Sequence, residues 1–448
     1  MKTAFEKFNF KSLGELKEKI KELNLDIPVS EDVSSLKCDA KIGDRALKNL
    51  LCVHPMEGCD SKEDGSPSDL VYRRYERFAK GGSGLLWVEA CAVNEGGRAN
   101  PRQLYIHEGN VDEFKNLVEF TRSKAEGEVY LVLQLTHAGR YAKPGKGLPA
   151  VIAGENEYLD RFLPQNVHTI TDDELSDLEN QFVNAALLAQ RAGFDAVDIK
   201  SCHRYLCNEL LASYNRKGKY GGSFENRTRF LFNIVKKVKE KADIDVTVRL
   251  NAFDEIPYPH GFGVDKSDYK IPDLTETKKI VSTLYELGVK LINITGGNPY
   301  YNPHVNRPYD VGFYTPVSHP LENVRKLLNA ARQIKKAVPD MRVIATGLTW
   351  LREYSANVAA GCINDGWFDF VGFGRQAFAY PDFANDIVNS GGMQRGKCCI
   401  ACGKCTEIMR DGGTTGCVIR DSKLYLPIYT EGRQGKQKIT GTRVGESI

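Results

Sequence analysis

The sequence predicts an α/β fold, a (β/α)8 barrel of the TIM type, from three observations. From residue 49 onward, eight short apolar runs typical of strands alternate with segments of helical periodicity. Alternating strands and helices predict a parallel sheet, and eight repeats over this length fit a barrel with insertions. A doubly wound sheet is the alternative, but no G-x-G-x-x-G motif follows the first strand.

The expected strands are short and rich in β-branched and aromatic residues. They are 50–53, 84–90, 129–135, 196–199, 246–250, 291–294, 342–345 and 368–372. The clearest expected helices are 173–192, 225–241, 274–287 and 321–338. Because parallel strands of a barrel all end at one rim, we expect ligand-binding residues directly after the strands.

Residues 1–40 predict a helical leader in front of the barrel. Leu13, Leu16, Ile20 and Leu23 recur at helical spacing among lysines and glutamates. We expect this helix to cover part of the barrel, with docking to a partner as the alternative. The barrel itself is predicted over 41–395, and a cysteine-rich segment and tail over 396–448.

Composition limits the classes of partner and compartment. The net charge is +3 in 448 residues, so the basic excess typical of nucleic-acid binders is missing. The first residues have no continuous apolar core, and no later run approaches the length of a membrane span. We therefore expect a soluble, cytoplasmic protein without nucleic acid or membrane as partner, whose 12 cysteines are reduced thiols or metal ligands.

Three side chains that can donate protons or hold an anion follow the fourth expected strand. They are Lys200, His203 and Tyr205, and a long loop is expected after them, up to the helix that begins near residue 225. This is the end of the strand where α/β folds bind ligands. The alternative is structural: a solvated lysine, a satisfied loop histidine and a packed aromatic.

Glycines follow the last two expected strands. Gly347 comes after the seventh, and Gly374 with Arg375 comes after the eighth. Glycine lets the backbone approach an anion closely, and arginine adds a charge-assisted hydrogen bond. Barrels commonly bind phosphate at this position, so we expect a phosphate site here.

The segment KCCIACGKCTEIMRDGGTTGC is the strongest local motif. Cys399, Cys402 and Cys405 are spaced C-x2-C-x2-C, and Cys417 follows twelve residues later. Three closely spaced thiolates and one distant thiolate fit a [4Fe–4S] cluster. Structural zinc, which prefers two separated pairs, and disulfides are the alternatives. Cys398 is left over in this interpretation.

The segment 220–230, YGGSFENRTRF, resembles the old yellow enzyme family of flavin-dependent ene-reductases. In that family a strand ends in a His/Asn-type pair, followed by a tyrosine and then such a segment. The resemblance extends from about Ile42 to Cys417. It is closest to the iron–sulfur branch that includes 2,4-dienoyl-CoA reductase and trimethylamine dehydrogenase. The cysteine spacing matches the latter better.

The resemblance implies a set of FMN-binding residues. Pro55, Met56 and Ala90 are expected to line the isoalloxazine, and Gln134 to bond its pyrimidine edge. Arg249 is expected near N1 and O2, where a fixed cation favours reduced flavin. Without the resemblance, Arg249 would be interpreted as half of a buried ion pair. Gly347, Gly374 and Arg375 would then hold the FMN phosphate.

The implied reaction is reduction of an activated C=C bond in an enone, enoate or enoyl thioester. Hydride would come from N5 of FMN and the proton from Tyr205, with Lys200 and His203 holding the substrate oxygen. The two cationic side chains are also expected to lower the Tyr205 pKa. Many family members have a His/His or His/Asn pair where this chain has Lys200 and His203, which predicts a more cationic site. Tyr300 stands where the dienoyl-CoA reductase branch has a histidine, and is expected to contact substrate.

Two other functions and several electron donors stay open. Oxidative amine demethylation is the enzymatic alternative, although Lys200 would repel a cationic amine. A flavin barrel that binds RNA through a zinc site is the alternative of a different class. Cluster-bearing relatives continue into a second half that binds FAD and a pyridine nucleotide. We therefore expect electrons from NAD(P)H, ferredoxin or a flavoprotein subunit, in an anaerobic setting, and a possible homo-oligomer.

Overall fold

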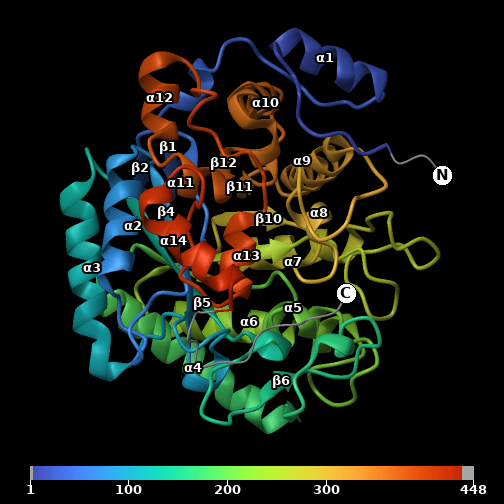
Figure 1. The fold of residues 1–448 in the computed structure, drawn as a ribbon. Helices are drawn as coiled ribbons and strands as arrows, with labels where there is room; N and C mark the ends of the chain where they lie inside the picture. Colours follow the sequence, from blue (N-terminus) through green and yellow to red (C-terminus); the bar gives the residue numbers. More distant parts are fainter. Residues whose placement is uncertain (1–3, 436–448) are drawn as a thin grey trace.

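The computed structural model describes residues 4–435, and a closed barrel of eight parallel strands lies at its centre (Figure 1). The strands follow one another around the barrel in chain order, and the last pairs with the first. They are β3 (Leu51–Val53), β4 (Leu85–Ala92), β5 (Tyr130–Thr136), β8 (Ala196–Ile199), β9 (Asp245–Asn251), β10 (Leu291–Thr295), β11 (Arg342–Ala345) and β12 (Phe370–Phe373). The predicted (β/α)8 fold is confirmed. The doubly wound alternative is wrong, because its sheet would be open.

Helices surround the barrel. They are α2 (Asp69–Lys80), α3 (Val111–Lys124), α4 (Asp172–Arg191), α5 (Leu206–Leu211), α6 (Phe224–Lys241), α7 (Thr275–Glu286), α8 (Pro303–Asn306), α9 (Pro320–Ala337), α10 (Ser355–Asn364), α11 (Arg375–Ala379) and α12 (Phe383–Ser390). Strands of this barrel are buried on both faces, so β4 and β5 have no exposed residue. The four helices expected from periodicity are α4, α6, α7 and α9.

Local sequence explains where these helices begin. The α4 helix begins after Thr171, whose hydroxyl accepts from the Glu174 N–H, while the Glu174 carboxylate accepts from the Thr171 N–H. This reciprocal capping box satisfies amide groups that have no partner inside the helix. Helix α5 is a correction to the expected long loop after Tyr205. Its six residues, LCNELL, are all buried, and a run this short has no readable helical period.

The leader packs against the outside of the barrel. Helix α1 (Leu13–Glu22) buries Leu16 and Ile20, and Figure 1 shows it beside α9 and α10. The carboxylate of Asp26 pairs with Arg325 and Arg332 of α9. The apolar face of this helix is therefore occupied within the chain.

A hairpin closes one end of the barrel. This hairpin consists of β1 (Ala40–Ile42) and β2 (Arg45–Leu47), which pair in antiparallel fashion. A separate small sheet is formed by β6 (Ala150–Ile152) and β7 (Val167–Thr169). Ile42 and Leu47 of the hairpin pack against the first residues of several barrel strands. The amino-terminal end of the barrel is therefore filled by apolar side chains.

The cysteine-rich segment crosses the other end, where the strands finish. Figure 1 shows α13 (Lys404–Arg410) and α14 (Ser422–Arg433), in red, in front of the barrel. The Thr415 N–H donates to the Gly58 carbonyl at 2.6 Å, and the Asp310 N–H donates to the Ala401 carbonyl at 3.1 Å. Residues 436–448 of the predicted tail lie outside the described residues.

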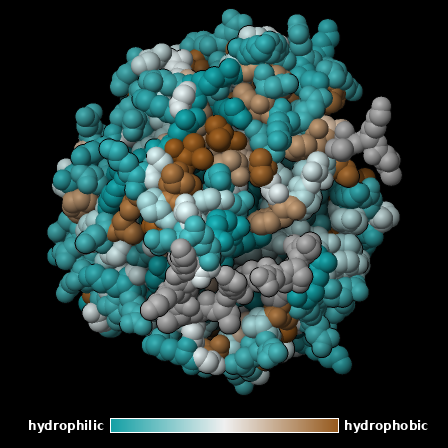
Figure 2. Space-filling view, in the orientation of Figure 1, coloured by the Kyte–Doolittle hydropathy of each residue, from teal (hydrophilic) through white to brown (hydrophobic). Residues whose placement is uncertain are grey.

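The surface seen in Figure 2 is mostly hydrophilic, with small groups of apolar side chains. The exposed apolar residues include Val311, Phe313, Ile419 and Leu426. Over residues 4–435, the structure contains no helix that combines the length and the apolar character needed to cross a membrane.

Candidate functional site

Five buried side-chain atoms near the carboxyl ends of the strands lack a hydrogen-bond partner among the described residues. They are His54 Nε2, His203 Nε2, Arg249 Nε, Asn293 Oδ1 and Thr346 Oγ1, which lie in or just after β3, β8, β9, β10 and β11. Buried polar groups in folded proteins are normally hydrogen-bonded. Five such atoms together at the ligand-binding end of a barrel fit a bound polar ring such as a flavin.

A buried carboxylate orients two of the predicted flavin contacts. The Asp198 carboxylate accepts from Trp87 Nε1 at 2.9 Å, from Gln134 Nε2 at 2.6 Å and from the Arg249 backbone N–H at 2.5 Å. Its side chain is fully buried, and burial raises its pKa. Asp198 therefore fixes Gln134 and the start of the Arg249 side chain. Among the described residues, Arg249 forms no ion pair within 4.0 Å and its Nε has no hydrogen-bond partner, so the alternative of a buried ion pair is wrong there.

The end of β3 approaches the end of β12 unusually closely. A Cβ on Gly372 would lie 2.1 Å from the ring of His54, so only glycine fits there. His54 Nδ1 and Asn293 Nδ2 are 3.0 Å apart, which fixes the ring and leaves Nε2 free. Burial and the charge of Arg249 hold the His54 pKa well below its ordinary value, so this imidazole is neutral.

The predicted flavin-lining and phosphate residues lie along the same rim. Met56 Sδ would be 2.7 Å from a Cβ on Gly374, and Gly347 has a φ of +98° that favours glycine. Arg375 is 8 % exposed and donates through Nη2 to the Pro308 carbonyl at 2.9 Å. Pro55 and Ala90 are buried. No carboxylate of the described residues lies within ion-pair distance of Arg375, so its charge is available for an anion.

The structure brings Tyr205 and Tyr300 together. Their hydroxyl oxygens are 3.2 Å apart, and the Tyr205 hydroxyl also donates to Glu57 Oε1 at 3.3 Å. Lys200 Nζ lies 3.6 Å from the centre of the Tyr205 ring and 3.8 Å from Glu57 Oε1. The backbone turns sharply before Tyr205, because His203 has a φ of +62°. Such strained positions cluster at functional sites.

Burial sets the protonation of these groups. It raises the pKa of Tyr205 well above its ordinary value, with further increases from Glu57 and Tyr300. We expected Lys200 and His203 to lower the pKa of Tyr205, and this was wrong. Burial lowers the Lys200 pKa, and burial with the Arg249 charge holds the His203 pKa well below its ordinary value. His203 is therefore a neutral hydrogen-bonding group.

Two residues of this group were not identified from the sequence. Glu57 belongs to the turn after the first strand, and its carboxylate contacts both Lys200 and Tyr205. The Tyr141 ring stacks on Tyr300 with centroids 3.9 Å apart, and the Tyr141 hydroxyl oxygen accepts a hydrogen bond from Asn298 Nδ2 at 3.0 Å. The position of Glu57 at a strand end was visible in the sequence, whereas no sequence pattern identifies Tyr141.

The four predicted cluster cysteines, Cys399, Cys402, Cys405 and Cys417, line one cavity, together with Arg375. The Ala401 N–H donates to Cys399 Sγ at 3.4 Å, and the Arg420 N–H donates to Cys417 Sγ at 3.3 Å. Cys398 does not line this cavity and donates to the Gln394 carbonyl at 3.4 Å.

Burial shifts the pKa of three thiols in this cavity. Burial raises the pKa of Cys399 to about 12 and also raises those of Cys402 and Cys417. Within residues 4–435, no group of three or more His, Cys, Asp or Glu side chains stands ready to hold a metal ion. Cysteine ligands bind metal as thiolates, so binding would deprotonate and draw in these side chains. The [4Fe–4S] cluster stays a prediction.

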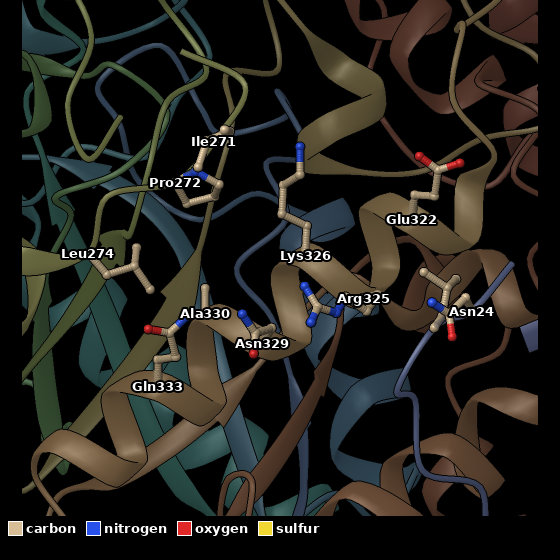
Figure 3. A pocket seen from close by; sticks show the side chains of 11 residues that line it. Asn24, Ile271, Pro272, Leu274, Glu322, Arg325, Lys326, Asn329, Ala330 and Gln333 are labelled. Atoms are coloured by element: carbon tan, nitrogen blue, oxygen red, sulfur yellow. The ribbon is translucent and has the colours of Figure 1, made fainter. Parts of the chain in front are cut away.

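A separate groove lies elsewhere on the molecule. It has a volume of about 560 Å³ and runs along the outside of α9, facing Ile271, Pro272 and Leu274 (Figure 3). Of its charged residues, Arg325 pairs with Asp26 and Lys326 pairs with Glu255. None of the predicted site residues lines it.

Two curated relatives show which proteins the chain is similar to. It is 28% identical over 376 residues to an NADH oxidase of Thermoanaerobacter brockii, covering 82% of this chain and 52% of that protein. It is 33% identical over 288 residues to an NADPH dehydrogenase of Listeria welshimeri, covering 63% of this chain and 79% of that protein. The chain thus spans about half the length of the first relative.

Solved structures share the fold at lower identity. A 2-naphthoyl-CoA reductase complex has a TM-score of 0.72 at 19% identity, covering 89% of this chain and 58% of that one. Old Yellow Enzyme from Pichia sp. AKU4542 has a TM-score of 0.62 at 22% identity, with coverages of 80% and 87%. Histamine dehydrogenase from Rhizobium sp. 4-9 has a TM-score of 0.65 at 19% identity, with coverages of 86% and 52%.

The model of one protein family matches residues 40–391, which is most of the chain and includes the whole barrel. The resemblance to the old yellow enzymes that the sequence predicted is confirmed at the level of the family, while the iron–sulfur branch stays a prediction. The chain belongs to the NADH:flavin oxidoreductase / NADH oxidase family.

Proposed function

We propose that this protein is an FMN-dependent reductase of C=C bonds that are activated by a carbonyl, carboxylate or thioester group. The observation that carries the proposal is the Tyr205 hydroxyl. It is held protonated beside Tyr300 and Glu57 and adjoins a rim of unpaired polar atoms that fits a flavin. A protonated phenol next to a hydride donor is what an ene reduction requires.

The residues at the rim would hold FMN in a defined orientation. Asp198 holds the Gln134 side chain and the Arg249 backbone. Gln134 and Arg249 would face the pyrimidine side of the ring, where Arg249 would stabilise negative charge. Pro55, Met56 and Ala90 would line the ring. Arg375, with the backbone at Gly347 and Gly374, would bind the phosphate, which supplies the countercharge that Arg375 lacks.

Bound FMN would supply a hydride to the carbon distal to the activating group. The charge that develops on the substrate oxygen is stabilised by hydrogen bonds from Lys200 and His203. The Tyr205 O–H bond breaks as its proton moves to the carbon next to the activating group, and the phenolate oxygen then recovers a proton from solvent. Tyr300, whose hydroxyl lies 3.2 Å away, donates to that phenolate while it is charged.

The cysteine cavity supports a route for electrons. A [4Fe–4S] cluster on Cys399, Cys402, Cys405 and Cys417 would supply single electrons, and backbone N–H groups already donate to two of these sulfurs. Arg375 lines the cavity and also belongs to the proposed phosphate site, so the two sites adjoin. The names of the relatives favour NADH or NADPH as the donor. Ferredoxin and a flavoprotein subunit are the other donors we consider.

Oxidation of an amine is the second candidate function. The likeness to histamine dehydrogenase and the three tyrosines Tyr141, Tyr205 and Tyr300 favour it, because aromatic rings bind cationic amines. Against it, Lys200 lies directly on the Tyr205 ring and would repel such a substrate. We therefore place reduction first.

Anaerobic purification followed by absorption spectroscopy tests the proposed function. We expect flavin and iron–sulfur bands together, bleaching of the flavin by NADH, NADPH or dithionite, and its re-oxidation by an enone such as benzylideneacetone. Flavin that is re-oxidised by no enone or enoate, yet is reduced by histamine or trimethylamine, would show that the protein oxidises amines instead.

A further inference from the structure

The carboxylate of Glu57 lies beside the proton donor, and the proposed reaction gives it no part in substrate recognition. Its Oε1 is 3.3 Å from the Tyr205 hydroxyl oxygen and 3.8 Å from Lys200 Nζ. These are the two residues that would act on the substrate, one through its proton and the other through a hydrogen bond. Glu57 is therefore close enough to respond to the charge of the group that activates the double bond.

An amide, and not a second cation, holds this carboxylate in place. Gln103 Nε2 donates to Glu57 Oε1 at 2.9 Å, and the Ala99 N–H donates to Gln103 Oε1 at 2.7 Å, which fixes the amide. Among residues 4–435, Lys200 is the one cation within 4.0 Å of Glu57, and Glu57 is the one carboxylate within 4.0 Å of Lys200. Their side chains are 6 % and 17 % exposed, so water screens this pair of charges only in part.

The other ionisable side chains near this pair are neutral or belong to the flavin side. Burial raises the pKa of Tyr300 above its ordinary value, so this side chain is a neutral phenol like the proton donor. Burial and the charge of Arg249 keep His203 neutral by lowering its pKa, and Arg249 itself is assigned to the flavin. The charges of Lys200 and Glu57 therefore cancel next to the substrate. Glu57 offsets the more cationic site that Lys200 predicted.

A free carboxylate fits poorly beside such a pair. An enoate would place its carboxylate at Lys200, while Glu57 already lies 3.8 Å from the same Nζ, and two like charges repel strongly where water is scarce. Hydride transfer would then add a second negative charge to the substrate. A ketone or thioester group starts uncharged, and the proton from Tyr205 cancels the charge that the hydride brings.

We propose that Glu57 selects substrates whose double bond is activated by an uncharged carbonyl, a ketone or a thioester, over substrates activated by a free carboxylate. This proposal rests on the proposed ene reduction and narrows its substrate class. Lys200 still donates a hydrogen bond to a carbonyl oxygen, but Glu57 cancels the net charge that would otherwise attract an anion. Repulsion of the wrong substrate is a common source of specificity.

A matched pair of alkenes tests this selection. Cinnamate and methyl cinnamate share the phenyl ring and the double bond, and differ in the charge of the activating group. Glu57→Gln removes the carboxylate charge and keeps the size of the side chain. The affinity for cinnamate relative to methyl cinnamate should rise about tenfold to a hundredfold, the effect of removing one nearby like charge. Glu57→Ala should shift this ratio in the same direction, and replaces Glu57→Gln if that variant does not retain flavin.

Two control variants separate the charge of Glu57 from its other contacts. Glu57→Asp keeps the carboxylate and should keep the preference for methyl cinnamate. Glu63→Gln removes an exposed carboxylate from the same part of the chain and should change neither affinity. Calorimetric titration into the oxidised, flavin-loaded protein gives both affinities without turnover. The ratio of the two kcat/KM values, measured with reduced flavin, should follow the ratio of affinities.

The outcomes distinguish the selection from the reaction. Cinnamate that binds to the unmodified protein as tightly as methyl cinnamate would overturn the selection, and so would a ratio that Glu57→Gln leaves unchanged. Lack of turnover with every alkene, while Glu57→Gln still improves the binding of cinnamate alone, would overturn the reaction and leave the selection by Glu57 standing.

Discussion

At the scale of single residues, the site depends on which groups hold the Tyr205 proton. Glu57 and Tyr300 both contact the hydroxyl, and a negative carboxylate beside a buried phenol favours the neutral phenol. Lys200 lies on the face of the ring rather than at the hydroxyl, and burial together with Glu57 keeps the Tyr205 pKa raised. The group is therefore arranged as a proton donor.

Removing only the hydroxyl tests that role. Tyr205→Phe should slow re-oxidation of reduced flavin by an enone or enoate by about 10²–10⁴-fold, the usual contribution of general acid catalysis. The ring stays, so packing and flavin content should not change. Stopped-flow absorbance at the flavin band measures the rate.

Re-oxidation by a one-electron dye is the matched control, because it needs no proton transfer to carbon. Equal slowing with dye and alkene would mean that Tyr205 supports the flavin rather than the substrate. An unchanged rate with the alkene would mean that Tyr300 or water, and not Tyr205, donates the proton.

At the scale of elements, the cysteine segment covers the barrel end where the strands finish. Its contacts to the β3 turn and to the loop after α8 hold it across the rim. Four of its thiols line one cavity and the fifth points away, so neighbouring cysteines should respond differently to mutation.

Iron content after anaerobic preparation tests this difference. Cys402→Ser should lose the cluster, because a cubane needs all four thiolates. Cys398→Ser should keep iron and acid-labile sulfide near four per chain. Stoichiometric zinc without iron in the unmodified protein would contradict the prediction. It would instead support a structural zinc site on these cysteines.

At the scale of the whole molecule, one hydrophobic core includes residues of the leader, the barrel and the cysteine segment. Leu16 and Ile20 of α1, the inner residues of the strands, and Cys398 and Ala401 all belong to it. The leader is thus part of the packed structure.

Shortening a buried side chain of α1 tests how much the leader contributes to the stability of the protein. Leu16 is fully buried, so Leu16→Ala should lower the free energy of unfolding by about 2–5 kcal/mol. Glu18→Ala, an exposed position on the same helix, should change it by less than about 0.5 kcal/mol. Urea unfolding followed by tryptophan fluorescence gives both values. A Leu16→Ala midpoint equal to that of the control would mean that the leader is not coupled to the core.

The sequence by itself determined the order of strands and helices, because hydrophobic periodicity is a local property of the chain. Eight runs gave eight strands, and the residues directly after them lie at one rim because parallel strands end together. The spacing of Cys399, Cys402 and Cys405 was equally local. The six-residue helix α5 escaped prediction since it is too short to show a period.

Only the tertiary structure decided how the site residues act on one another. The partners of Tyr205 are 148 and 95 positions away in the chain, and no spacing reveals such contacts. The direction of each pKa shift depends on burial and on these partners, which is why the Tyr205 shift was predicted with the wrong sign. The ion pair of Lys200 with Glu57, whose atoms lie 3.8 Å apart, became visible for the same reason. An ion pair, or its absence, is a property of the folded chain.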